Sequence, residues 1–417
     1  MRRAQAVLVA ASFSWLLAGT NAVNPLLPLY RSELGFDALL LSLTYVCYVA
    51  VLTVFFLVMA SPSLVRFAAV SLVAALLLAA GGDLLLWTAT ESGVLAGRAV
   101  SGVAGGLGTG AASALVVVAI GDRGRAITAT GNLVGAVLGA GGAQLAVFLL
   151  GVHALEAVYL IHALSCLVLG AVLAVVLWLR REANRAALRA TRGVRLRWSQ
   201  LHGGVAPLLC GAFAWVALSI SVVLIPSLLE ELGLTVSAWS AVVLVLAASA
   251  GVQVLSGPVG RIAPWLSGIE LIAAGCLILG AAILTRTDWC GVIGVAVTGI
   301  GIGITYRLGL VTLTRGAPAA RQGTLASLYG TVSYGTAAVT TLLAGFAGRH
   351  FGLQPTVLTA LVALTVLGAV LLRPAPRTPR SEGRRTRGGM SLDTTSHPVL
   401  PRPGESQPPQ LPVRTPG

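Results

Sequence analysis

Long apolar segments, separated by short polar ones, account for most of the chain. A helix needs about 20 apolar residues to cross the hydrocarbon core of a membrane, and segments of that length recur as far as residue 372. We therefore predict an all-α membrane protein with twelve transmembrane helices. The predicted spans are residues 6–27, 37–58, 67–88, 92–119, 126–149, 156–179, 205–229, 238–258, 264–285, 289–314, 323–347 and 353–372.

Polar segments divide the chain into four parts. The longest internal one, residues 180–203, is rich in Arg and separates six predicted spans from six. We predict an N-terminal six-helix half (1–179), a cytoplasmic basic linker (180–203), a C-terminal six-helix half (204–372) and a cytoplasmic tail (373–417). The linker fits either a short helix on the membrane surface or a solvated loop. The tail is rich in Arg and Pro and cannot bury a core, so we predict that it is disordered.

The two halves repeat a short motif. The segment from Pro28 to Gly35 (PLYRSELG) aligns with the segment from Pro226 to Gly233 (PSLLEELG), and each follows the first span of its half. This agreement predicts two pseudo-symmetric halves. Parallel six-span halves are typical of transporters, in which the halves rock around a site near the middle of the membrane.

Composition and charge support a membrane protein and predict its orientation. Only 10% of the residues are charged, whereas a soluble domain carries about 25%. All 28 basic residues are Arg. Of these, 23 lie in segments on the same side of the membrane as the N-terminus, and three lie in loops on the opposite side. The positive-inside rule then places both termini in the cytoplasm of a bacterial cell, with the chain in its inner membrane. We expect the basic linker and tail to contact anionic lipids and not nucleic acid.

Features that could suggest other chemistry are interpreted as helix packing. The five Cys lack metal-ligand spacing. His153 and His162 have no metal-ligating partner at ligand spacing and are interpreted as hydrogen-bonded packing residues. The glycine run from Gly105 to Gly110 lies inside an apolar span and follows no strand, unlike a phosphate loop. The sequence therefore predicts no enzyme activity, no metal site and no cofactor.

Three motifs carry a resemblance to a known family. They are Gly19-x5-Pro25-x2-Pro28 in the first predicted span, Gly97-Arg98-x3-Gly102 in the fourth and Gly131-x3-Gly135-x3-Gly139 in the fifth. With these motifs, residues 5–372 resemble the major facilitator superfamily, and within it the twelve-span proton-coupled drug exporters. The chain departs from the family pattern at Ala140, where the exporters have Pro, and in two loops that lack the usual Asp.

The resemblance implies a transport cycle of alternating access and assigns roles to motif residues. Arg98 is expected to take part in proton coupling. The expected gating and packing residues are Pro25, Pro28, Gly102, Gly135, Gly139, Arg66 and Arg261.

Ionisable residues inside predicted spans are functional candidates, because each must find a partner or water. Asp83 and Arg98 lie at matching depths in the third and fourth spans, and Glu270 and Arg307 do so in the ninth and tenth. We predict two acid–Arg pairs, one in each half, that take up and release protons. The alternative is that each pair only fixes helix packing, or that Asp83 reaches water.

Aromatic and amide side chains in the spans are candidates for substrate binding. Aromatic rings with a few hydroxyls and amides suit a moderately hydrophobic, ring-bearing substrate. The alternative for the Tyr and Trp residues is a role in packing or at the membrane interface. The candidates are Asn21, Asn24, Tyr45, Tyr48, Trp215, Tyr306, Tyr329 and Tyr334.

Three functions remain open at this point. The first is a monomeric proton antiporter that exports a drug-like or natural-product small molecule. The second is a major facilitator of another type that carries sugars or other metabolites. The third is a membrane enzyme or a non-transporting protein with a transporter fold, although no catalytic cluster supports an enzyme.

Overall fold

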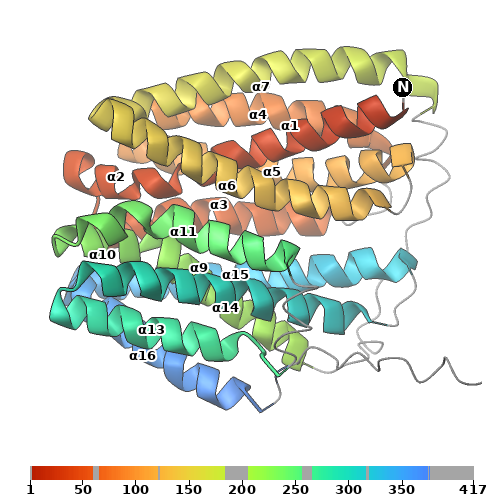
Figure 1. Ribbon diagram of the computed structural model, residues 1–417. Helices are drawn as coiled ribbons and strands as arrows, with labels where there is room; N and C mark the ends of the chain where they lie inside the picture. The colour runs from red at the N-terminus through yellow and green to blue at the C-terminus, as the bar shows by residue number, and fades with distance from the viewer. Residues whose placement is uncertain are drawn as a thin grey trace, which may run out of the picture. The chain divides into compact units, whose positions relative to one another are not determined.

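The computed structural model describes residues 2–59, 65–120, 123–183, 205–255, 265–315, 319–373 and 375. All regular structure in this part of the chain is helical, and twelve helices have 17 or more residues. Figure 1 shows these helices side by side along a common direction. The all-α fold predicted from the sequence is confirmed.

Six of the long helices belong to the N-terminal half: α1 (Arg2–Ala22), α3 (Ala38–Met59), α4 (Ala68–Trp87), α5 (Glu91–Ile120), α6 (Arg123–Leu150) and α7 (Ala154–Leu179). Six belong to the C-terminal half: α9 (Ala206–Val223), α11 (Thr235–Val254), α13 (Ile269–Thr285), α14 (Asp288–Thr314), α15 (Ala319–Phe351) and α16 (Leu353–Leu371). The short helices are η1 (Asn24–Leu26), α2 (Leu27–Leu34), η2 (Val65–Phe67), η3 (Gly151–His153) and α10 (Ile225–Glu231).

The helices expose apolar surface that only lipid can cover. In the described residues, nine helical stretches are long and apolar enough to cross a membrane, and one of them, Leu133–Leu179, contains most of α6 and all of α7. Helix α7 is apolar on both faces, because Leu164, Val168 and Val175 are exposed while Cys166 and Leu173 on the other face are buried. A water-soluble helix would place polar residues on its exposed face. The chain is therefore a multi-pass membrane protein.

The two halves pack their helices in the same pattern. In the N-terminal half the extensive contacts join α4 to α5, α3 to α5, α1 to α6 and α4 to α7. In the C-terminal half the corresponding contacts join α13 to α14, α11 to α14, α9 to α15 and α13 to α16. The motif repeat in the sequence thus accompanies a repeat in the packing.

The first helix of each half is interrupted at a proline. Helix α1 ends at Ala22 and the chain continues through η1 and α2, because Pro25 has no N–H to donate into the helix. In the second half α9 ends at Val223, and α10 follows with Pro226 in its first turn. Gly35 after α2 and Gly233 after α10 have φ angles of +70° and +76°, which glycine adopts without strain. We call the end of the bundle that holds α2 and α10 the α2–α10 end; in Figure 1 it lies opposite the N-terminus.

Glycines of the family-like motifs lie where two helices touch. A Cβ atom on Gly139 would come within 1.9 Å of the Ala18 carbonyl oxygen, and one on Gly135 within 2.3 Å of the Ser14 carbonyl oxygen. Gly102 faces α3 in the same way, with the Tyr48 carbonyl oxygen at 2.5 Å. Backbone atoms cannot move aside as flexible side chains do. Helices α1 and α6, and α3 and α5, can therefore approach this closely only because these residues are glycines.

The contact between α1 and α6 predicts a stability difference between two glycines of one helix. Gly139→Ala forces α6 away from Ala18 and should lower the free energy of unfolding by about 1–3 kcal/mol. Gly141→Ala places its methyl group where no atom lies within 4 Å, so it should be neutral or stabilising by up to about 1 kcal/mol. Thermal unfolding of both purified variants in one detergent measures the difference. Equal melting temperatures would show that this packing is not tight.

Candidate substrate and coupling site

Arg98 is a fully buried cation in the N-terminal half. It lies on α5 with 1% of its surface exposed. Its Nε donates to the Thr44 carbonyl oxygen of α3 at 2.8 Å, and its Nη1 donates to the Thr20 carbonyl oxygen of α1 at 2.8 Å. The guanidinium carbon lies 4.4 Å from the centre of the Tyr48 ring. Arg98 thus joins three helices through two hydrogen bonds and a cation–π contact.

The break in α1 explains why Thr20 accepts this hydrogen bond. The last four carbonyl groups of a helix have no partner inside the helix. Thr20 falls in the last turn of α1, which ends at Ala22 ahead of Pro25. The proline of the first motif therefore leaves an acceptor free for the arginine of the second motif.

The predicted pair of Asp83 with Arg98 is wrong. Asp83 on α4 is buried, and its Oδ2 lies 2.6 Å from Nδ1 of His162 on α7. Helix α7 brings His162 to the depth of Asp83, whereas the Arg98 side chain reaches the carbonyl groups of α1 and α3 instead. Within the described residues, no carboxylate forms an ion pair with Arg98.

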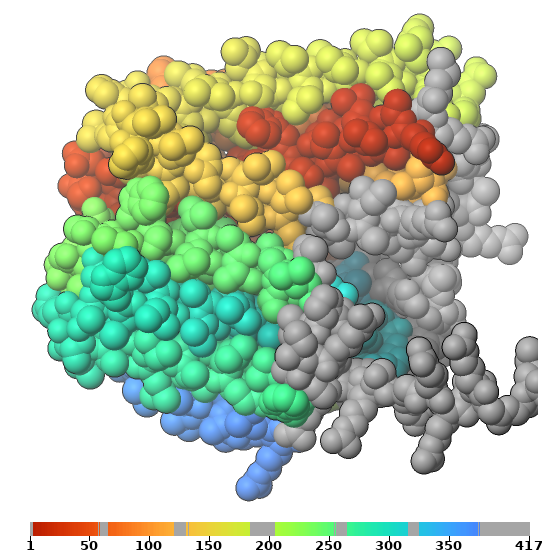
Figure 2. All heavy atoms as spheres, viewed as in Figure 1, coloured from red at the N-terminus to blue at the C-terminus, as the bar shows by residue number. Residues whose placement is uncertain are grey.

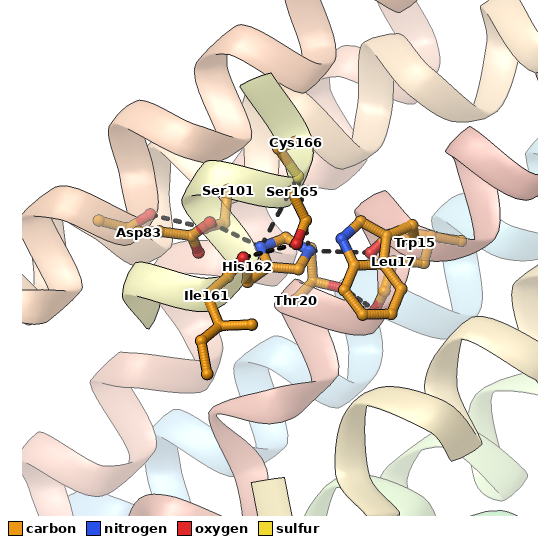
Figure 3. A network of polar contacts seen from close by, with 10 residues as sticks. Trp15, Leu17, Thr20, Asp83, Ser101, Ile161, His162, Ser165 and Cys166 are labelled. Atoms are coloured by element: carbon orange, nitrogen blue, oxygen red, sulfur yellow. Dashed lines mark hydrogen bonds and ion pairs between the residues drawn. The ribbon is translucent and has the colours of Figure 1, made fainter. Parts of the chain in front are cut away.

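His162 is the centre of a buried polar network (Figure 3). Its Nδ1 contacts Asp83, and its Nε2 lies 2.9 Å from the Trp15 carbonyl oxygen of α1. The Cys166 sulfur, one turn further along α7, lies 3.6 Å from Nε2, and the Trp15 ring stacks on the imidazole with 5.7 Å between centroids. A Cβ on Gly19 would overlap the imidazole at 2.1 Å, so the glycine makes room for the ring.

The network contains metal-ligating atoms without the spacing of a metal site. The ligand atoms of Asp83, His162 and Cys166 lie within 4.8 Å of one another, and they are the one such group in the described residues. A zinc ion between a histidine nitrogen and a carboxylate oxygen needs about 2.0–2.2 Å to each. The 2.6 Å contact between these two atoms is instead a direct hydrogen bond.

The predicted pair of Glu270 with Arg307 is also wrong. Glu270 lies in the first turn of α13, and its Oε2 accepts hydrogen bonds from the Ser267 hydroxyl at 2.6 Å and the Ser267 N–H at 3.2 Å. Arg307 on α14 is exposed and donates to the Gln253 carbonyl oxygen of α11. The carboxylate closes the turn before its own helix, a local contact that equal depth in two spans does not reveal.

Aromatic side chains of both halves gather inside the bundle. The Trp215 ring of α9 lies 4.0 Å from that of Tyr334 on α15 and 5.9 Å from that of Tyr306 on α14, measured between centroids. Tyr48 on α3, whose ring stacks with the Arg98 guanidinium, packs against the same hydrophobic core as these three rings. These four residues, which we call the aromatic cluster, are only partly buried although their helices lie inside the bundle. They are the best-placed of the predicted substrate residues.

The remaining predicted substrate residues occupy different surroundings. Tyr329 is fully buried between α9 and α14, and its hydroxyl donates to the Tyr306 carbonyl oxygen at 2.7 Å, which is a packing position. Tyr45 is buried in the core shared by the two halves. Asn24 is buried in η1, and the Asn21 amide donates to the Leu17 carbonyl oxygen at 2.9 Å. Their roles in binding stay predictions.

Several cross-half contacts close the bundle at the α2–α10 end. Arg31 pairs with Glu231 at 2.6 Å, and Arg349 with Asp37 at 3.4 Å. A Cβ on Gly345 of α15 would lie 2.2 Å from the Ser42 hydroxyl of α3, so these two helices also approach more closely than a larger residue at 345 would allow.

A second set of contacts joins α6 to α11. The Gln144 amide nitrogen donates to the Trp239 carbonyl oxygen at 2.9 Å, and the Trp239 indole N–H donates to the amide oxygen at 2.8 Å. Figure 2 shows α6 lying against α11 on this face. Beside this pair is a cavity of about 220 Å³, lined mostly by apolar atoms and bordered by Pro25, Pro28 and Pro226. Pro25 and Pro28, the two prolines predicted to act in gating, therefore lie at a contact between the halves.

Of the two arginines predicted to act in gating, the structure describes one. Arg66 is exposed in η2, with its guanidinium carbon 4.7 Å above the Phe67 ring. Arg261, the basic linker beyond residue 183 and the tail beyond residue 375 lie outside the described residues. The predicted lipid contacts of the linker and the tail stay predictions.

Two six-helix halves, joined through a closed end and enclosing a buried arginine and an aromatic cluster, define a membrane transporter fold. The chain belongs to the Major Facilitator Superfamily, whose sequence model matches residues 8–341. No curated protein sequence matches the chain.

Solved structures support the fold at low sequence identity. The nucleoside transporter NupG is similar with a TM-score of 0.64 and 13% identity, over 89% of this chain and 98% of NupG. A bacterial homologue of the human lysosomal transporter Spinster, in an inward-facing and occupied conformation, is similar with a TM-score of 0.64 and 14% identity, over 89% of this chain and 96% of the homologue. At this identity the likeness shows the fold alone.

The sequence contains a signal for the His162 network. In the predicted spans His162 lies six residues after the start at residue 156 and Asp83 five residues before the end at residue 88, so the two share a depth at the same end of the bundle. Matching every ionisable group by depth, and not only acids with arginines, would have found the pair. The pairing of Gln144 with Trp239 had no comparable signal, because neither residue carries a charge.

The closed end predicts how one glycine controls access. Gly345→Val forces α15 away from Ser42 and so destabilises the closed state. If this costs about 1.4 kcal/mol, the open state becomes about tenfold more populated. A cysteine in place of the buried Tyr45 should then react with maleimide about tenfold faster. Gly335→Val lies on the same helix, where no atom is within 4 Å of a Cβ, and serves as control. The measurement uses a background without native cysteines. Equal labelling rates for the two variants would show that this contact does not hold the end closed.

Proposed function

We propose that the protein is a proton-coupled secondary transporter that exports a ring-bearing, moderately hydrophobic small molecule through the bacterial inner membrane. The observation that carries the proposal is the buried Arg98 guanidinium stacked on Tyr48 at the edge of the aromatic cluster. Rings of the substrate would stack on the cluster, and Arg98 would face a polar or anionic group of the substrate.

The energetics of Arg98 support a functional role. A buried charge is costly in a membrane protein even when it is hydrogen-bonded, and such residues usually mark a transport pathway. Two backbone carbonyl groups accept hydrogen bonds from two of the guanidinium N–H groups. They do not neutralise its charge, so an acidic or polar group of a substrate would gain from contact with it.

The closed α2–α10 end supports alternating access. The Arg placement in the sequence favours an orientation with this end outside the cell and both termini in the cytoplasm. In this interpretation the ion pairs Arg31–Glu231 and Arg349–Asp37 seal the external side, and export requires the cross-half contacts there to separate. The alternative function, uptake or efflux of a sugar or another metabolite, uses the same fold and differs in the substrate.

The proposal predicts resistance that depends on Arg98. Expression in an efflux-deficient bacterial strain should raise tolerance to at least one ring-bearing toxic compound in a panel. Collapse of the proton gradient should remove the effect. Accumulation of the compound inside cells would instead favour uptake.

Arg98→Met separates a functional role from a structural one. Methionine fills the site without a buried charge, so the melting temperature should stay within a few degrees of the wild type, while transport should fall about tenfold or more because the polar contact is lost. Export at the wild-type rate by this variant would remove Arg98 from the site.

A further inference from the structure

The hydrogen bonds of His162 restrict where protons reside. Nδ1 faces a carboxylate oxygen at 2.6 Å, and Nε2 faces a backbone carbonyl oxygen at 2.9 Å. A carbonyl oxygen only accepts, so Nε2 must carry a hydrogen for that contact to be favourable. The other contact also needs a hydrogen, which resides either on Nδ1 or on the Asp83 carboxyl group.

These requirements are met only when the pair holds its proton. One arrangement is an imidazolium beside an ionised Asp83, and the other is a neutral imidazole beside a protonated Asp83. The two arrangements contain the same number of protons and are electrically neutral as a pair. A pair that has lost this proton has a single hydrogen for two contacts. In one of the contacts, two acceptor atoms then face each other with no hydrogen between them, which is repulsive.

We propose that Asp83 and His162 form the proton-binding site of this transporter, and that loss of the proton releases the contact between His162 and α1. The inference rests on the proposed proton-coupled transport and names the groups that carry the proton. The remaining hydrogen would stay between His162 and the ionised carboxylate, because a charge-assisted hydrogen bond is the stronger one. The contact to Trp15 would then be lost.

The position of the pair connects it to the rest of the site through α1. His162 contacts α1 at Trp15 and fills the space in front of Gly19. The next residue, Thr20, accepts the hydrogen bond from Arg98. A shift of α1 after proton loss would therefore move an acceptor of Arg98 and, one residue further on, the Asn21 side chain.

The described titratable groups nearest the pair are a thiol and a phenol of α7. Cys166 and Tyr159 belong to α7 with His162, and the Tyr159 hydroxyl is hydrogen-bonded to Tyr30 of α2 at 2.5 Å. Helix α5 contributes the Ser101 hydroxyl, which donates to its own helix. Arg98, on the same helix, donates to carbonyl groups of α1 and α3 and remains positive throughout.

Histidine NMR tests the proton-binding site without a substrate. The protein is labelled with ¹⁵N-histidine and reconstituted in lipid, and the His162 signals are assigned by their loss in His162→Gln. Between about pH 5 and about pH 9 the His162 signals should change with pH, as expected for a group that gains and loses a proton in this range. In Asp83→Asn the pH dependence should shift or vanish, and in Cys166→Ala it should persist. Signals of His162 that do not move with pH would overturn the inference.

Transport in proteoliposomes tests the coupling, using a compound identified by the resistance panel. Asp83→Asn and His162→Gln should lose accumulation driven by a pH gradient by about tenfold or more, and should retain substrate exchange without a gradient within about threefold. Cys166→Ala serves as the matched control and should keep both. Gradient-driven accumulation by either variant at the wild-type level would overturn the inference while leaving transport itself established.

Two further outcomes keep the proposals distinguishable. If the single variants do not fold, the double variant Asp83→Asn, His162→Gln replaces the pair by two neutral hydrogen-bonding side chains, and it should fold and exchange substrate without responding to the gradient. Gradient-driven accumulation by the double variant would overturn the inference. If the wild-type protein moves no compound of the panel, the proposed function fails, whereas the NMR titration still decides whether the pair binds a proton.

Discussion

Every polar group inside this bundle must find its partner within the protein, because lipid offers none. Two ionisable groups of the N-terminal half meet this constraint by joining helices. Arg98 uses carbonyl groups of α1 and α3, and His162 uses a carbonyl group of α1 and a carboxylate of α4. The acceptors that they need exist because α1 breaks at Pro25 and because Gly19 leaves space for the imidazole. Helix α1 is therefore the element on which the site depends.

The fold could be predicted from the sequence because lipid imposes a simple pattern. The length of each apolar segment and the positions of the breaks between segments were enough for the all-α architecture, and the PxxP motif marked the break in α1. The glycines of the fifth span predicted close packing, and Gly135 and Gly139 do touch the backbone of α1. Hydropathy did not predict that α10 would form a separate short helix, because the apolar segment of α9 continues without interruption as far as Leu229.

The partners of the buried charges could not be predicted in the same way. Depth along a helix says nothing about the direction in which a side chain points, so Asp83 was matched to Arg98 when it faces α7 instead. Glu270 was treated as a group inside a span, although it lies in the first turn of α13 and bonds to Ser267. The aromatic residues were easier to select than to place. The Tyr329 ring touches that of Tyr306 but is fully buried, whereas Trp215, Tyr306 and Tyr334 lie together and are partly exposed.

The contact between Ala18 and Gly139 has a consequence for how the sequence can evolve. A side chain cannot be added at residue 139 while α1 keeps its path, because the Ala18 carbonyl group already fills the space. Homologues that enlarge residue 139 would have to move α1, and with it the acceptors of both Arg98 and His162. Selection on the buried polar groups should therefore also hold the size of a residue that touches neither of them.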